Sequence, residues 1–144
     1  MDRRIELTPR FLWGIGTALL LGVGSLGPWV TLGPFSASGT GDGNDGAITL
    51  VIAIVAAVLI CLRRWNIITG LLAVGALVVG IVDTNDVSSA GNDVLEPSVG
   101  WGLVAVDVAA VSLIVWALVA LRASRRDRKA VSSAHEAEIP SPNA

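Results

Sequence analysis

Apolar residues gather into four runs along the chain, and short polar segments separate these runs. The runs lie at about 11–32, 47–62, 65–82 and 99–121. Because an α-helix rises about 1.5 Å per residue, roughly 20 apolar residues cross the hydrocarbon core of a bilayer, which is about 30 Å thick. The pattern therefore predicts an all-α fold, a four-span transmembrane helical bundle that occupies residues 11–121.

The residues that bound the runs predict where helices begin and turn. Thr8-Pro9 is a typical helix start before the first run. That run is too long for the apolar core of a secretory signal peptide, and no clear small-x-small cleavage site follows it, so we expect an uncleaved span. The second run is short, and its helix is expected to begin inside the preceding loop or to meet a locally thinned bilayer. The short turn at Arg63-Arg64 requires the second and third spans to be antiparallel neighbours.

Basic residues lie only outside the apolar runs. They are Arg3, Arg4, Arg10, Arg63, Arg64, Arg122, Arg125, Arg126, Arg128 and Lys129. Lys and Arg near span ends mark the cytoplasmic side of a membrane. We therefore expect both termini to be cytoplasmic, with residues 1–10 as a short lead and residues 122–144 as a basic, then disordered, tail.

The two remaining polar segments, 33–46 and 83–98, are predicted to be loops on the outer side of the plasma membrane. Their charged residues are all acidic: Asp42, Asp45, Asp83, Asp86, Asp93 and Glu96. The chain thus separates its charges across the membrane, and a formal net charge of -2 hides this separation.

The composition agrees with a membrane protein. Hydrophobic residues make up 53% of the chain and charged residues 15%, whereas soluble domains contain about 25% charged residues. Arg strongly outnumbers Lys, and Ala, Val and Gly abound, which is typical of a GC-rich bacterial genome. The single Cys61 excludes an intrachain disulfide framework.

Asp107 lies inside the fourth apolar run. A carboxylate there costs a few kcal/mol, so we expect its side chain to face the bundle interior and to find a partner. The hydroxyl groups available on other spans are those of Thr17, Ser25, Thr49 and Thr69. Three roles stay open for Asp107: contact between helices, pairing with a charge on another subunit, and handling of protons or cations.

The outer loops repeat a small acidic pattern. Its residues are Asp42, Asn44 and Asp45 in the first loop and Asp83, Asn85 and Asp86 in the second. Carboxylates and amides on a Gly-rich backbone are ligands that a hard cation such as Ca²⁺ prefers. Asp and Asn also form turns in such loops, and the spacing does not match an EF-hand. Turn formation, cation binding and partner recognition are therefore the alternatives for these residues.

Small residues recur every four positions on the first span, at Gly14, Ala18 and Gly22. Such spacing lets helix backbones approach closely in lipid, so this face is expected to pack inside the bundle or to form a homo-oligomer. Tryptophans mark span ends: Trp29 closes the first span at the expected headgroup level, and Trp101 and Trp116 bracket the fourth.

The motifs of several function classes are absent from the sequence. It contains no Walker loop, no Cys or His pair with metal-binding spacing, and no Ser/His/Asp set, since the only histidine, His135, lies in the tail. We therefore expect neither an enzyme nor a bound cofactor. The basic residues near the fourth span need no nucleic-acid partner, because each gains about 1 kcal/mol near an anionic leaflet.

The segment from Gly27 to Leu50 contains Gly27-Pro28-Trp29 and then Ser38-Gly39-Thr40-Gly41-Asp42-Gly43. It resembles the first-loop signature of small four-span bacterial membrane proteins of uncharacterised function. In these proteins a Pro-Trp pair ends span one, and a Ser-Gly-Thr-x-Asp-Gly segment leads into span two. The resemblance implies a topology and no activity.

These observations favour a non-enzymatic accessory or scaffold protein, with the lipid bilayer and a membrane protein or a second copy as its partners. The alternative is a small channel, or a component of a cation- or proton-coupled transporter, that uses Asp107 and the outer acids. A polar path from the outer loops to Asp107 would favour transport, and a sealed bundle would favour a scaffold.

Overall fold

The computed structural model describes residues 8–41, 45–62, 66–89 and 97–138, with the backbone alone from 127 to 138. Its helices are α1 (Pro9–Leu26), α2 (Asp45–Cys61), α3 (Asn66–Ser89) and α4 (Trp101–Glu138). Its strands are β1 (Pro28–Leu32), β2 (Phe35–Ser38) and β3 (Ser98–Val99).

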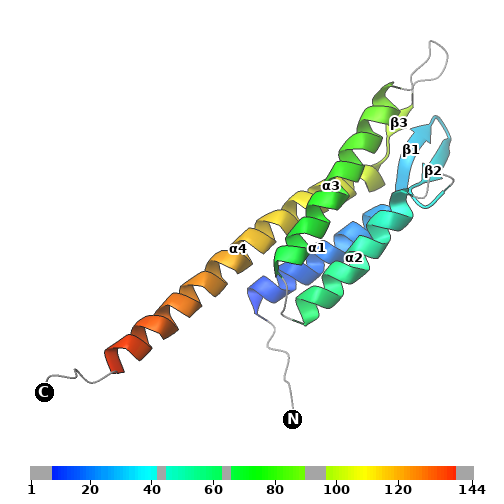
Figure 1. Ribbon diagram of the computed structural model, residues 1–144. Coiled ribbons are helices and arrows are strands. Elements are labelled where there is room, and N and C mark those ends of the chain that lie inside the picture. Colours follow the sequence, from blue (N-terminus) through cyan, green and yellow to red (C-terminus); the bar gives the residue numbers. More distant parts are fainter. Residues whose placement is uncertain (1–7, 42–44, 63–65, 90–96, 139–144) are drawn as a thin grey trace, which may run out of the picture.

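The four helices alternate in direction and pack side by side, with the strands at one end of the bundle (Figure 1). Each helix contacts two neighbours, because α1 packs on α2 and α4, and α3 packs on the same two helices. The segments Pro9–Leu26, Ile67–Ser89 and Trp101–Arg126 are long and apolar enough to cross a membrane, whereas Asp45–Cys61 is apolar but shorter. The protein is therefore a helical membrane protein.

Helix α1 begins where the sequence predicts and ends earlier. Thr8 caps its start by accepting a hydrogen bond from the Phe11 backbone N–H at 3.3 Å. The helix was expected to reach Leu32, but it ends at Leu26. Pro28 explains this difference, because a proline disfavours the helical conformation of the preceding residue, and Gly27 is indeed extended, with φ -72 and ψ 172.

A small antiparallel sheet follows α1, in the order β2-β1-β3. Gly33, with φ 56, turns the chain from β1 into β2. Strand β3 then pairs with β1 in the register Val30 opposite Val99 and Thr31 opposite Ser98. The all-α prediction is thus incomplete, since part of the segment predicted as a loop at 33–46 is a strand.

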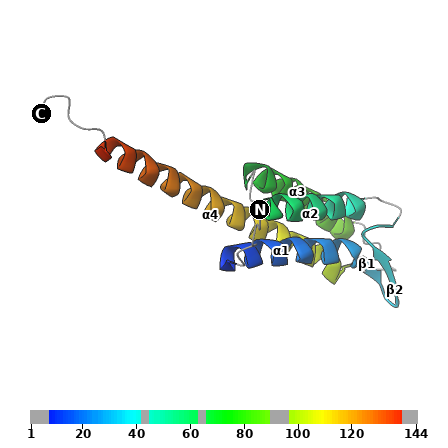
Figure 2. The same ribbon diagram turned by 90° about the horizontal axis from the view of Figure 1, so that it is seen from below.

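Two helices extend beyond their predicted ends. Helix α3 continues to Ser89, through the first part of the predicted loop 83–98. Helix α4 continues to Glu138, into the segment predicted to be disordered, and it projects past the other helices in both views (Figures 1 and 2). Neither extension contains Gly or Pro, the two residues that most strongly oppose a helix.

The bundle interior is built largely from alanine. Its buried alanines are Ala18, Ala53, Ala56, Ala73, Ala76, Ala109, Ala110, Ala117 and Ala120. Many larger apolar side chains, such as Leu19, Val51, Leu71 and Val108, are exposed on the helix surfaces instead. Small residues inside and large apolar residues outside are typical of helices that pack closely within lipid.

Candidate functional site

Trp29 anchors the sheet to the end of the bundle. Its side chain is 6% exposed, and its indole N–H donates to the Gly24 carbonyl oxygen at 3.0 Å. Gly39 lies against the ring so closely that a Cβ at this position would overlap it. Trp29 is therefore a buried residue of the capped end, and its place at the headgroup level stays a prediction. The sheet and the segment through Gly39 are called the cap below.

Backbone contacts hold the cap on two helices. The Gly46 N–H at the start of α2 donates to the Gly39 carbonyl oxygen at 2.9 Å, and the Gly100 N–H before α4 donates to the Trp29 carbonyl oxygen at 2.7 Å. A Cβ at Gly46 would overlap the Gly39 backbone, and a Cβ at Gly100 would overlap the Pro28 carbonyl. A side chain at either glycine would therefore push the cap away from the helix, and glycine is the residue that permits this close approach.

A buried polar contact joins α1 and α2 beneath the cap. Ser25 Oγ lies 2.8 Å from Thr49 Oγ1 and 2.8 Å from the Leu21 carbonyl oxygen. The Thr49 hydroxyl donates to the Gly46 carbonyl oxygen at 3.0 Å. Both side chains are fully buried, and lipid offers no hydrogen-bond partner for their hydroxyl groups. This contact therefore satisfies both groups and links α1 to α2 at one register.

Three of the predicted outer acids converge under the cap. Asp45, Asp83 and Asp86 line one hollow of about 160 Å³, together with Trp29 and residues of β2. The cap thus borders an acidic hollow at the interface of α2 and α3.

The predicted cation site is only partly assembled. Asp42 and Asn44 lie outside the described residues, and Asn85 is exposed and does not line the hollow. Within the described ranges, no group of three or more His, Cys, Asp or Glu side chains is arranged to hold a metal ion. The cation site therefore stays a prediction, and the structure shows an acidic surface hollow.

Asp107 points from α4 to α3, and its partner differs from the predicted ones. Its Oδ2 accepts a hydrogen bond from Thr84 Oγ1 at 3.4 Å, while its buried Oδ1 has no partner among the described residues. A Cβ at Gly80 would overlap Oδ1, so the absence of a side chain there makes room for the carboxylate. Thr84 was assigned to a loop, and only the extension of α3 beyond Val82 brings it to Asp107.

The predicted packing residues of α1 contact neighbouring helices. A Cβ at Gly14 would lie 2.8 Å from the Trp116 indole, and one at Gly22 would lie 3.7 Å from Ala53 Cβ. Ala18 is buried in the core. The indole N–H of Trp116 donates to the Arg10 carbonyl oxygen at 2.8 Å, so Trp116 lies inside the bundle, whereas Trp101 is exposed.

Sequence reasoning missed Gly80, Thr84 and the anchoring role of Trp29. One signal was present: Gly80 and Thr84 are four residues apart and so share a helix face. This spacing did not lead to a prediction, because the apolar pattern ends at Val82 and Thr84 was therefore expected to lie in a loop. The burial of Trp29 had no local signal, since it depends on Gly39 and Gly100 in other segments.

The resemblance of residues 27–50 to small four-span bacterial proteins stays a prediction. Comparisons of the chain with protein-family models, with curated proteins and with solved structures found no match.

Proposed function

We propose that this chain is a four-span protein of the bacterial plasma membrane with both termini in the cytoplasm. Its role is that of a non-enzymatic accessory or scaffold protein, which presents the cap and the acidic hollow to another protein outside the membrane. The observation that carries this proposal is the apolar interior beneath Asp107. A proton or cation path usually carries ionisable groups across the bundle, but the buried polar side chains in the described ranges are the neutral hydroxyls of Thr17, Ser25, Thr49 and Thr69.

The shape of that interior supports a sealed bundle. One core layer beneath the cap contains Leu21, Leu103 and Val106, each with no exposed surface. A second layer toward the other end contains Leu113 and Trp116. Close-packed apolar side chains exclude water. The buried polar side chains of the described ranges are neutral hydroxyls, among them Thr17 and Thr69, so a proton or cation that reached Asp107 from the cap would meet no ionisable side chain buried in the bundle.

The length and direction of α2 support four spans. Its 17 residues correspond to roughly 26 Å of helix, slightly less than the hydrocarbon core, and local thinning of the bilayer covers such a difference at a modest cost. The helix runs antiparallel to α1 and α3 (Figure 1). A membrane-spanning role for α2 places the cap outside and the turn at Arg63-Arg64 in the cytoplasm, in agreement with the basic residues.

The exposed strand β2 supports recognition of a partner. All of its residues, Phe35–Ser38, are exposed, and Phe35 is 76% exposed. It is an edge strand, and proteins usually cover or charge the edges of sheets to avoid unwanted pairing. An exposed aromatic side chain on an edge strand of the described sheet, beside an acidic hollow, is suited to anchor a binding partner.

Photo-crosslinking in living cells tests this role. A photoreactive residue at Phe35 or Ala37 is expected to give one discrete adduct with a second protein, because both positions lie on the exposed strand β2. Val111 is the matched control, since its exposed side chain lies midway along the apolar part of α4 and is expected to contact lipid alone. Asp83→Asn combined with Asp86→Asn should weaken the adduct if the acidic hollow contributes to binding.

Two outcomes contradict the proposal. One is the absence of any adduct specific to the cap positions. The other is proton or cation flux by the purified protein in liposomes that is lost in Asp107→Asn, because this result would establish transport as the function.

A further inference from the structure

We propose that Arg10, Arg122 and Arg126 form a binding site for the phosphate group of an anionic phospholipid, at the end of the bundle opposite the cap. The three side chains line one hollow of about 260 Å³, together with Val119 and Ala123. Arg10 comes from the first turn of α1, and the other two come from α4, four residues apart and hence on one face of that helix.

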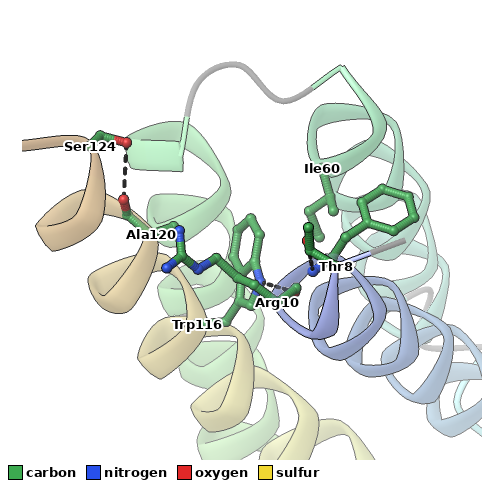
Figure 3. Close-up of a pocket in the computed structure, with 7 residues that line it drawn as sticks. Thr8, Arg10, Ile60, Trp116, Ala120 and Ser124 are labelled. Carbon is green, nitrogen blue, oxygen red and sulfur yellow. Dashed lines mark hydrogen bonds between the residues drawn. The ribbon is translucent and has the colours of Figure 1, made fainter. Parts of the chain in front are cut away.

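A hydrogen bond from Trp116 to the backbone of Arg10 holds this residue against α4. The Arg10 carbonyl oxygen accepts the hydrogen bond from the Trp116 indole N–H at 2.8 Å, which ties the start of α1 to α4. Figure 3 shows the Arg10 side chain extending from α1 across Trp116 toward α4. In this view the guanidinium group points to α4, the helix that carries the other two arginines.

The positive charge of this hollow favours binding of an anion. Among the described residues, none that lines it is acidic, so three like charges from two helices converge there. Guanidinium groups bind phosphate oxygens through paired hydrogen bonds and are the preferred side chains for this purpose. A phosphate group supplies both the charge and the acceptor oxygens.

Apolar surroundings favour a lipid over free phosphate. The apolar run of α4 ends at Leu121, directly before Arg122, so the hollow lies at the boundary between apolar and basic surface. Val119 forms part of its lining. A second hollow of about 250 Å³ shares Arg10 and is lined by Phe11, Ile60 and Trp116 (Figure 3). A phospholipid fits this arrangement, since its phosphate is joined directly to apolar chains.

Native mass spectrometry of delipidated protein, titrated with phosphatidylglycerol or phosphatidylcholine of the same acyl chains, tests the site. We expect clear preference for phosphatidylglycerol. Each arginine near an anionic headgroup contributes about fivefold in affinity, so Arg122→Gln with Arg126→Gln should weaken binding about 25-fold. Arg10→Gln should weaken it about fivefold, because the carbonyl contact to Trp116 is retained.

Arg125→Gln is the matched control. Arg125 is exposed on the same helix but does not line the hollow, so this variant should bind phosphatidylglycerol like the wild type. Circular dichroism verifies that each variant keeps its helix content. Equal losses in Arg125→Gln and in Arg122→Gln/Arg126→Gln would show a general charge effect and overturn the site. Equal binding of both lipids, or displacement of the lipid by millimolar inorganic phosphate, would overturn it as well.

Discussion

Gly80→Ala is expected to destabilise the bundle by about 1–3 kcal/mol, the range for overfilling a packed contact. The physical reason is the overlap between the new methyl group and the Asp107 carboxylate, which is confined between α3 and α4. Gly75→Ala on the same helix is the matched control. A Cβ at Gly75 has no neighbour within 4 Å, so this change should be neutral or stabilising by up to about 1 kcal/mol. Unfolding in mixed micelles, followed by circular dichroism, measures both effects.

A double-mutant cycle identifies the carboxylate as the cause. In Gly80→Ala/Asp107→Ala the overlapping group is removed, so the double variant should be more stable than the sum of the single changes predicts, with a coupling of about 0.5–3 kcal/mol. Strict additivity would mean that Asp107 does not occupy the space beside Gly80. That result would remove the structural basis for the orientation of Asp107.

Trp29→Ala is expected to release the cap and to cost about 3–5 kcal/mol, the usual range for truncating a buried aromatic residue. The variant loses the hydrogen bond to Gly24 and the packing of the ring on Gly39. Amide hydrogen exchange should accelerate across β1 and β2, Pro28–Ser38, and at Gly46, whose N–H depends on the position of Gly39.

Phe35→Ala is the control for the cap. It truncates another aromatic side chain of the same hairpin, but Phe35 is exposed, so stability and exchange should stay close to those of the wild type. Protection of Val30 and Gly46 that is unchanged in Trp29→Ala would contradict the anchoring role of Trp29.

Much of the helical architecture could be predicted from the sequence because its determinants are local. Apolar runs located the helices, Thr8-Pro9 located the start of α1, and Arg63-Arg64 separated α2 from α3. The interior position of Asp107 followed from the cost of a carboxylate in lipid. Each of these conclusions needs only neighbouring residues and the solvent.

The cap could not be predicted because its determinants are distant in sequence. Strand β1 pairs with β3 through Val30 and Val99, and strand propensity depends strongly on such context. The glycines that make room for Trp29 lie after β2 and before α4. The local sequence pattern of a turn-rich loop is therefore similar to that of this hairpin, and the two cannot be distinguished without the distant contacts.

The partner of Asp107 was missed for a related reason. The apolar pattern marks the part of a helix that lies in lipid, and it says little about a polar extension of the same helix. Residues 83–89 of α3 are polar but contain no helix breaker. Thr84 thus lies on a helical turn that faces Asp107, close to the capped end, so the carboxylate lies near the cap and not midway through the bundle.

The central claim is that helix α2 crosses the membrane, because the proposed outward position of the cap and the proposed cytoplasmic position of the arginine site both depend on it. A membrane-impermeant thiol reagent applied to sealed, right-side-out vesicles tests it with single cysteines in a Cys61→Ser background. Ser36→Cys on β2 should react at once, whereas Leu62→Cys at the end of α2 and Ser124→Cys on α4 should react only after permeabilisation. All three positions are exposed on the protein surface, so access depends on the membrane. Immediate labelling of Leu62→Cys in sealed vesicles would place both ends of α2 on one side and contradict the four-span topology.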